Sequence, residues 1–257
     1  MTEDEKAYET KWFEASQNLI PTTLAFVESR LDLNELQIEH IHQAKIAFDF
    51  MRHGLAYLEE ANRRGHHAIS LSLLRQTVDP LFLVQCGLLG TDVAQNALRD
   101  WQDSKTTMGK LRKRYGASVW GCTKQTFMNM SWSEFMASMF GAVQEYAHYG
   151  QNTLQWSMSQ YGQSSVADDG NYLVPMKMWS YDSEQATRIT MFQAIIVSTL
   201  TQTLLTSSNI HGWQVSGVDS TLSTFREGLD QSKLIIHPFN WETELLGMSF
   251  VAPGSGG

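Results

Sequence analysis

Apolar residues along this chain recur mostly at spacings of three and four, which is the period of an α-helix. A clear example lies between residues 41 and 58, with apolar side chains at Ile41, Ala44, Phe48, Met51, Leu55 and Leu58. No run of strictly alternating apolar and polar residues, the pattern of a half-buried strand, stands out. The pattern therefore predicts an all-α fold, a multi-helix bundle of about seven or eight helices.

Residues that start and stop helices set the expected boundaries. Pro21 suits the first turn of a helix, Asn34 suits a helix cap, and Gly65 suits a stop. Ser131 and Glu134 have the spacing of a capping box. The expected helices cover residues 3–19, 21–31, 34–64, 66–89, 91 through 101 to a basic run, 131–161, 182–208 and 218–234.

The chain shows no repeat of fixed length and no charge-rich linker, so a single all-α domain over residues 1–237 is the simplest prediction. A polar loop near residues 162–175 is the best candidate for a boundary between two lobes. Residues 238–257 look like loop and tail, and the last five, Pro-Gly-Ser-Gly-Gly, resemble an artificial linker.

Composition shows where charge is missing. The 257 residues include 19 Lys and Arg and 27 Asp and Glu, which gives 18% charged residues and a net charge of −8. A hydrophobic fraction of 42% excludes a disordered chain. Residues 189–218 carry no charge at all, yet many are Thr, Ser and Gln. That polarity favours an interior helix or a subunit contact over a membrane span.

Several classes of site and compartment are disfavoured. The amino terminus is acidic where a signal peptide would be basic and then apolar, and Cys86 and Cys122 stand alone, so we expect a cytoplasmic protein with reduced thiols. Histidines, cysteines and acids do not have metal-ligand spacings. The chain also lacks phosphate-loop, hydrolase-elbow and dinucleotide motifs. We therefore expect no metal and no cofactor.

Two charges interrupt the apolar stretch at residues 68–91. Arg75 and Asp79 lie four residues apart, which places them on one face of a helix within reach of an ion pair. Pro80 predicts a kink beside them. Two interpretations stay open: a structural pair that ties the kinked helix to a neighbour, or an Arg75 that lines a polar cleft and binds an anion such as phosphate.

A polar stripe runs along the helix expected at residues 131–161. It places His148 between Glu145 and Asn152, which would orient the imidazole ring for general acid or base catalysis. The same stripe is also what a plain solvent-facing surface looks like. Both interpretations stay open.

A basic run lies near the middle of the chain. Residues 99–124 have a local net charge of +5 although the whole chain is acidic. Cations there would neutralise phosphates, and a neighbouring aromatic ring would stack on a base. The candidate nucleic-acid-binding residues are Lys110, Arg112, Lys113, Arg114 and Tyr115. The alternative is a solvated helix end, where the helix dipole favours cations.

The segments Leu73-Leu-Arg-Gln-Thr-Val-Asp79 and Tyr146-Ala-His148 resemble a loose group of uncharacterised bacterial helical proteins related to the HEPN superfamily. There, an apolar helix with a Leu-Leu-Arg-x-x-x-acid core precedes a helix that ends in aromatic-x-His. The resemblance implies a helical bundle, often dimeric, and RNA cleavage in toxin–antitoxin or phage-defence systems. Active relatives carry Arg, four to six residues and then His on one helix. This chain lacks that spacing.

Two functional hypotheses follow. In the first, a bacterial protein binds RNA and, if it is an enzyme, cleaves it without metal: Arg75 holds a phosphate, His148 acts as acid or base, and Glu145 or Asn152 orients it. This requires Arg75 and His148 to meet across helices. In the second, the chain is a non-enzymatic helical subunit, a homo-oligomer or bound to a protein partner, with residues 189–218 as its contact surface. Membrane attachment is a third and less favoured hypothesis.

Overall fold

The computed structural model describes residues 3–34, 36–104, 106–144, 165–166, 172–173, 181 and 183–232. Within these ranges the chain is an all-α bundle, as the sequence pattern predicts. The helices are α1 (Glu3–Leu33), α2 (Ile41–Arg63), α3 (His67–Leu89), α4 (Asp92–Gln102), α5 (Met108–Trp120), α6 (Trp132–Gln144), α8 (Ser183–His211) and α9 (Val218–Asp230). Two antiparallel pairs of two-residue strands accompany them, β1 (Thr126–Phe127) with β2 (Met130–Ser131) and β3 (Ser165–Val166) with β4 (Tyr172–Leu173).

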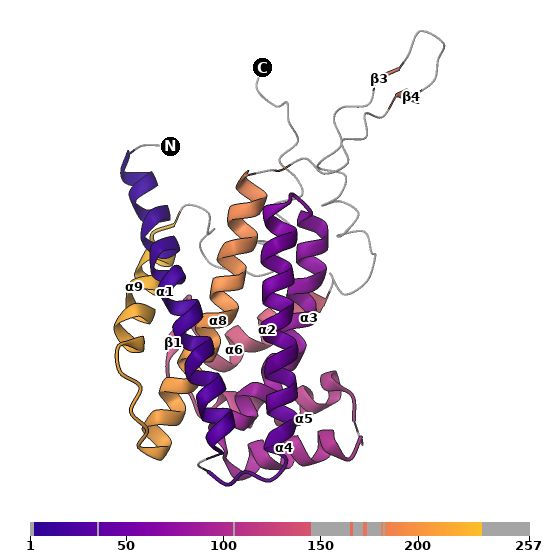
Figure 1. Ribbon diagram of the computed structural model, residues 1–257, viewed down its shortest axis with the longest axis vertical. Helices are drawn as coiled ribbons and strands as arrows, with labels where there is room; N and C mark the ends of the chain where they lie inside the picture. Colours follow the sequence, from indigo (N-terminus) through magenta and orange to yellow (C-terminus); the bar gives the residue numbers. More distant parts are fainter. Residues whose placement is uncertain are drawn as a thin grey trace.

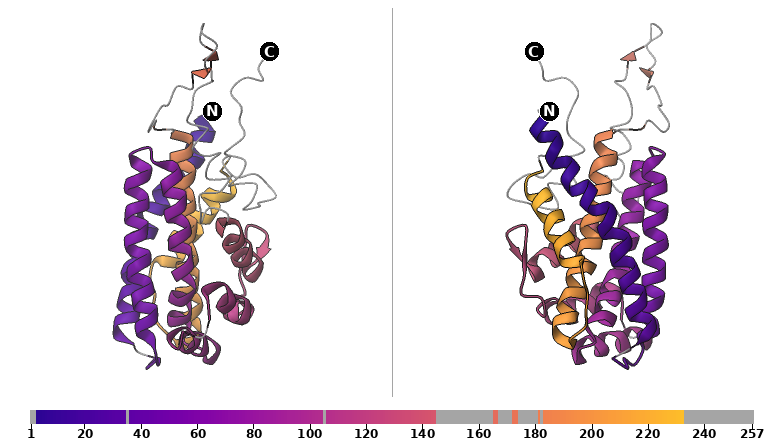
Figure 2. Two further views of the ribbon diagram at one scale, coloured as in Figure 1. Left: turned by 90° about the vertical axis from the view of Figure 1, so that its right-hand side faces the viewer. Right: turned by 60° about the vertical axis from the view of Figure 1, so that its left-hand side comes forward.

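The four long helices α1, α2, α3 and α8 run along the long axis of the molecule (Figure 1). α2 and α3 form an antiparallel hairpin, and α9 packs on the outer side of α1. The shorter α4 crosses the lower end, while α5 and α6 lie on the side away from α2 (Figure 2). The buried apolar residues of all these helices belong to one hydrophobic core.

Helix α8 is the buried centre of the bundle. Its polar side chains bond to the surrounding elements: Thr201 shares a hydrogen bond of 2.7 Å with Thr23 of α1, and Thr206 one of 2.9 Å with Thr123. By length and composition residues Gln185–His211 would suffice to cross a membrane, but 89% of the apolar window is buried inside the protein. The charge-free segment is thus mostly an interior helix, and little of it is free to contact a partner.

The amino-terminal helix differs from the prediction. α1 continues through Pro21, where the sequence predicts two helices. Pro21 is exposed, and buried residues on both sides of it, among them Leu19 and Val27, hold the helix against the core. Packing therefore outweighs the one backbone hydrogen bond that a proline removes.

Asn34 does not cap α2. Its Oδ1 accepts a hydrogen bond of 2.8 Å from the amide of Ile38, within the loop that leads to α2. The helix begins only at Ile41. An asparagine side chain bonds equally well to the backbone of a loop and of a helix start, so the residue type alone does not separate the two.

The helix expected to run from residue 91 into the basic run is two helices. Thr91 caps α4 and Thr107 caps α5, through hydrogen bonds to the amides of Ala94 and Lys110. Between the two helices Ser104 has φ of 53°, a left-handed conformation that ends α4. The basic run therefore belongs to α5, a helix of its own.

Other boundaries agree with the prediction. Gly65 has φ of 80° just after α2, and Ser131 and Glu134 form the capping box of α6. The amide of Ser131 donates to Glu134 Oε2 at 3.0 Å, and the bonds from Ser131 lower the pKa of the Glu134 carboxyl. The continuation of this helix to residue 161, most of the 162–175 loop and the tail at 238–257 lie outside the described residues.

Candidate functional site

Arg75 and Asp79 form the ion pair that their spacing predicts. Nη1 of Arg75 lies 2.5 Å from Oδ2 of Asp79 on the next turn of α3. The other carboxylate oxygen, Oδ1, lies 2.6 Å from Nη1 of Arg112 on α5. The side chains of both arginines are only 10% exposed, whereas that of Asp79 is 34% exposed. One carboxylate therefore joins α3 to α5, which is the structural interpretation of the pair.

The cluster also reaches α6. The Arg112 guanidinium lies 4.4 Å from the centre of the Phe140 ring, so three helices meet at this point. Burial lowers the pKa of Arg112, and its hydrogen bond to Asp79 opposes that shift. Two arginines against one aspartate leave one positive charge in excess, and Nε of Arg75 is buried without a hydrogen-bond partner in the described part of the chain. The anion-binding interpretation therefore keeps a physical basis.

The rest of the basic run consists of residues that bond within the protein and lysines that are exposed to solvent. Arg114 pairs with Asp100 at 2.8 Å, and Tyr115 donates its hydroxyl to the same carboxylate at 2.7 Å. The second bond holds the hydroxyl end of Tyr115, and stacking of its ring on a base stays a prediction. Lys110 and Lys113 are exposed, and neither forms an ion pair with another described residue. They are the cations on α5 that an external phosphate would reach first.

The remaining predicted catalytic residues, His148, Glu145 and Asn152, lie outside the described residues. Arg75 is thus the one member of that set whose surroundings are known, and it is bound to Asp79. A cleft shared by Arg75 and His148 stays a prediction. Across the described ranges, no group of three or more His, Cys, Asp and Glu side chains is placed to hold a metal ion.

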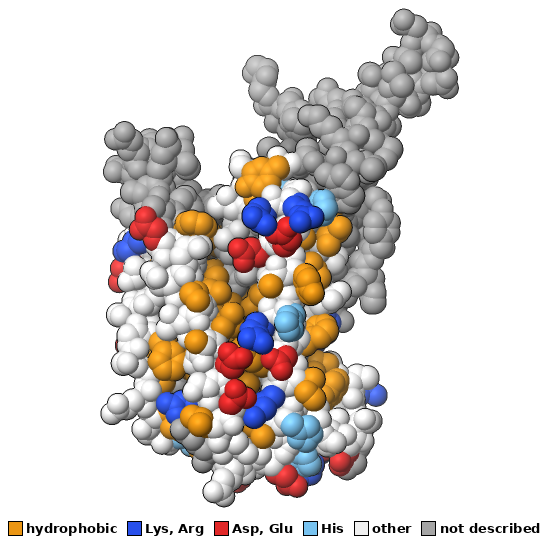
Figure 3. Space-filling view, in the orientation of Figure 1, with side chains coloured by type: hydrophobic (Ala, Val, Ile, Leu, Met, Phe, Trp, Pro, Cys, Tyr) orange, Lys and Arg blue, Asp and Glu red, His pale blue; other side chains and the backbone are white. Residues whose placement is uncertain are grey.

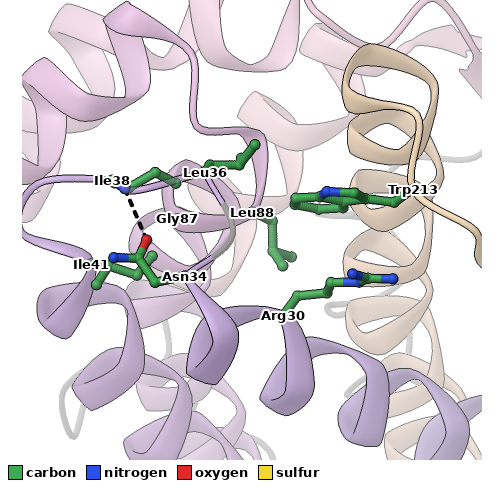
Figure 4. A pocket seen from close by; sticks show the side chains of 8 residues that line it. All are labelled: Arg30, Asn34, Leu36, Ile38, Ile41, Gly87, Leu88 and Trp213. Carbon is green, nitrogen blue, oxygen red and sulfur yellow. Dashed lines mark hydrogen bonds between the residues drawn. The ribbon is translucent and has the colours of Figure 1, made fainter.

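A small cavity lies where the ends of α1 and α3 meet the loop before α2 (Figure 4). Its volume is about 10 Å³, room for a single water molecule. Arg30 lies over the ring of Trp213 at 5.0 Å and closes one side. The cavity is thus a packed junction between helices and too small for a ligand.

A much larger cleft, of about 1000 Å³, lies between α1, α2 and the start of α8. Figure 1 shows α1 leaning away from α2 and α8 toward this end of the bundle. Hydrophobic side chains follow the depression between α1 and α2 (Figure 3). The sequence pattern does not predict this cleft, because its walls come from helices far apart in the chain and no local motif marks it.

The solvent-facing side of α2 carries an apolar stripe, which we define as Ile46, Phe50 and Tyr57. Each of these side chains is more than half exposed. Spacings of four and seven residues place them on one line along the helix, opposite the buried Met51 and Leu55. Figure 3 shows hydrophobic side chains next to the charged ones on this face. The sequence contains this stripe, but the apolar residues on the core-facing side of α2 form the longer and more regular pattern.

Comparison with known proteins adds no relative to these observations. No protein-family model, no curated protein and no solved structure matches the chain. The resemblance to the HEPN superfamily therefore rests on its short motifs alone.

Proposed function

We propose that this chain is a non-enzymatic helical subunit that associates with a second copy of itself through the apolar stripe of α2. The observation that carries the proposal is the gathering of Ile46, Phe50 and Tyr57 on one solvent-facing line. Single exposed apolar residues are ordinary, but a contiguous group marks a contact surface. Burial of apolar area is the main favourable term in most protein–protein association.

The stripe has the geometry of a helix-pairing seam. Ile46 and His53 are seven residues apart, as are Phe50 and Tyr57, and the seven-residue period keeps a seam facing its partner helix. If two copies of α2 pack antiparallel about a two-fold axis between residues 51 and 52, Ile46 meets Tyr57 and Phe50 meets His53. A two-fold contact uses the same surface twice, so the stripe supplies its own partner.

Charges at the two ends of α2 favour the antiparallel arrangement. Glu39 precedes the helix and Arg64 follows it, and both side chains are exposed. The same two-fold axis brings Glu39 of one copy beside Arg64 of the other, whereas parallel pairing would set like charges together. A stable dimer would need further contacts around the stripe, since specific interfaces bury more than about 1,000 Å² in total.

Size-exclusion chromatography with light scattering tests this proposal. We expect the protein to have twice the monomer mass of 29.1 kDa at micromolar concentration, and Phe50→Glu to have the monomer mass. Ser223→Glu is the matched control, because it adds the same charge at an exposed position of α9 and should leave the dimer intact. A monomeric wild-type protein, or equal masses for wild type and Phe50→Glu, would contradict the proposal.

RNA binding is a second candidate function, with the metal-independent cleavage in bacterial defence that the HEPN resemblance implies. The observation that favours it is the positive charge on and beside α5: exposed Lys110 and Lys113, and the excess charge of the Arg75–Asp79–Arg112 cluster. Phosphate contacts of this kind weaken steeply as salt rises.

The same chromatography tests the second candidate through the ratio of absorbance at 260 and 280 nm. Co-purified RNA would raise the ratio, and the double variant Lys110→Glu/Lys113→Glu should return it to that of free protein. Cleavage of RNA in the presence of a chelator, lost in His148→Ala, would extend binding to catalysis. A ratio of free protein together with no retention of added RNA at low salt rejects this function.

A further inference from the structure

The cleft between α1, α2 and α8 has the size and lining of a small-molecule site. Its volume of about 1000 Å³ is at the upper end of the range for such sites. One wall comes from α1 and is mainly apolar: Trp12, Phe13, Ile20 and Leu24 line it, together with the polar Ser16 and Gln17. Apolar walls of this kind bind the body of a ligand by removing it from water.

A polar floor faces that wall. Asn62 of α2 is fixed there, since its Nδ2 donates to the carbonyl of Ala186 at 2.8 Å and its Oδ1 pairs with Nδ1 of His67 at 2.8 Å. Its side chain therefore has little left to offer a ligand. It joins α2 to α8 and holds the floor in place.

Gln193 of α8 is different, because one of its polar atoms is left over. Its Nε2 donates to the carbonyl of Leu55 at 3.5 Å, and its Oε1 has no partner among the described residues. The residue is only 6% exposed, yet it lines the cleft. An acceptor that lines a cleft without a protein partner can accept a hydrogen bond from a donor on a bound molecule.

The charges at the rim indicate an uncharged ligand. Glu59 and Arg63 line the cleft with opposite signs, and Arg63 is itself bound to Glu60. Among the described residues that line the cleft, no excess of positive charge is available for a phosphate or carboxylate. Tyr181, which is largely exposed, adds a second aromatic ring to the lining of the same cleft as Phe13. Aromatic rings at a cleft suit a flat apolar molecule.

We propose that this cleft binds an uncharged, mainly aromatic small molecule that donates one hydrogen bond to Oε1 of Gln193. The ligand's rings pack against the α1 wall, and its single donor group reaches the α8 floor. This site is separate from the apolar stripe of α2, so it does not depend on the dimer proposed above.

The probe N-phenyl-1-naphthylamine matches this description, since it is uncharged, has two aromatic groups and carries one N–H donor. We expect a saturable rise in its fluorescence on binding to the full chain. Its N-methylated analogue lacks the donor and should bind about tenfold more weakly, the value of one hydrogen bond. In Gln193→Met the two probes should bind equally, at the weaker affinity.

Three further variants locate the probe. Gln17→Trp fills the cleft from the exposed side of α1 and should abolish binding, whereas Gln125→Trp, at an exposed position outside the cleft, should bind as wild type does. Phe50→Glu should also bind normally, because the α2 stripe is not the site. Absence of saturable binding, unchanged binding in Gln17→Trp, or loss of binding in Phe50→Glu each overturns the proposal. Equal binding of the two probes to wild type overturns the role of Gln193.

Discussion

Asp79 is the residue on which the junction of α3 and α5 depends, because its two oxygens accept from two different arginines. Asp79→Asn would leave Arg75 and Arg112, each with a side chain 10% exposed, facing one another without a compensating charge. Removing one partner from a buried ion pair costs about 3–5 kcal/mol. Since the Asp79 side chain is a third exposed, we expect a loss of about 2–3 kcal/mol in the free energy of unfolding, measured by urea denaturation.

Asp100→Asn is the matched control for this prediction. Asp100 pairs with Arg114, whose side chain is 70% exposed, and its remaining partner, the Tyr115 hydroxyl, donates equally well to an amide oxygen. The expected loss is below about 1 kcal/mol. If the two variants lose the same stability, the cluster around Asp79 does not have the structural role assigned to it.

The sequence predicts one half of this cluster and not the other. Arg75 and Asp79 are one helical turn apart, so their meeting follows from helix geometry alone. Arg112 lies 33 positions beyond Asp79, and only the packing of α5 on α3 brings it to the same carboxylate. The hydroxyl of Tyr115 likewise bonds to Asp100 on another helix, 15 positions earlier in the chain. Contacts between helices are decided by packing that no local spacing records.

At the scale of helices, the crossing of α1 and α9 depends on Gly228. A Cβ atom at this position would lie 2.6 Å from the backbone nitrogen of Trp12 and 2.9 Å from its Cα. The backbone of a packed helix cannot yield as a side chain does, so α1 and α9 would have to separate. We expect Gly228→Ala to destabilise the protein by about 1–3 kcal/mol, which thermal unfolding would show as a Tm lower by roughly 3–10 °C.

Gly141→Ala serves as the comparison for this prediction. A Cβ at Gly141 on α6 meets no atom of another described residue within 4 Å. Alanine has a higher helix propensity than glycine, so this variant should be more stable by about 0.5–1 kcal/mol. A shift of the same sign in both variants would show that helix propensity, and not the close approach of α1 and α9, determines the outcome.

The helix ends show which helix boundaries can be predicted from the sequence. The boundaries predicted from Gly65 and from the Ser131–Glu134 capping box are correct, because each of these signals acts within a few residues of the helix end. Pro21 is misleading because α1 is anchored to the core on both sides of it. The end of α4 is missed because it depends on the left-handed backbone of Ser104, a residue type that gives no strong signal.

For the whole molecule, the period of the apolar residues is sufficient to predict an all-α bundle, because each helix must bury one face. The cleft and the apolar stripe need more than periodicity. The cleft exists because α1 diverges from α2 and α8 (Figure 1). The stripe is recognised only once the opposite face of α2 is known to be the buried one. Both depend on how complete helices are arranged in space.

The single core predicts that the described helices unfold together. Gln85 of α3 connects two neighbours within it: its Oε1 accepts from Nε1 of Trp120 at 3.1 Å, and its Nε2 donates to Oγ1 of Thr203 at 3.3 Å. Gln85→Leu leaves both groups buried without these bonds, at a cost of about 1–3 kcal/mol. In urea, tryptophan fluorescence and far-UV circular dichroism should show one common midpoint, which the variant lowers equally for both signals.

Gln76→Leu on the exposed side of α3 makes the same chemical change outside the core. It should change the free energy of unfolding by less than about 0.5 kcal/mol. The physical reason for a common transition is that α8 contacts α1, α2, α3 and α9. If any of these helices unfolded, α8 would be exposed to water and would lose part of its packing. Separate midpoints for the two signals, or a shift of only one of them in Gln85→Leu, would mean that the α3–α8 core and the outer helices are independent units.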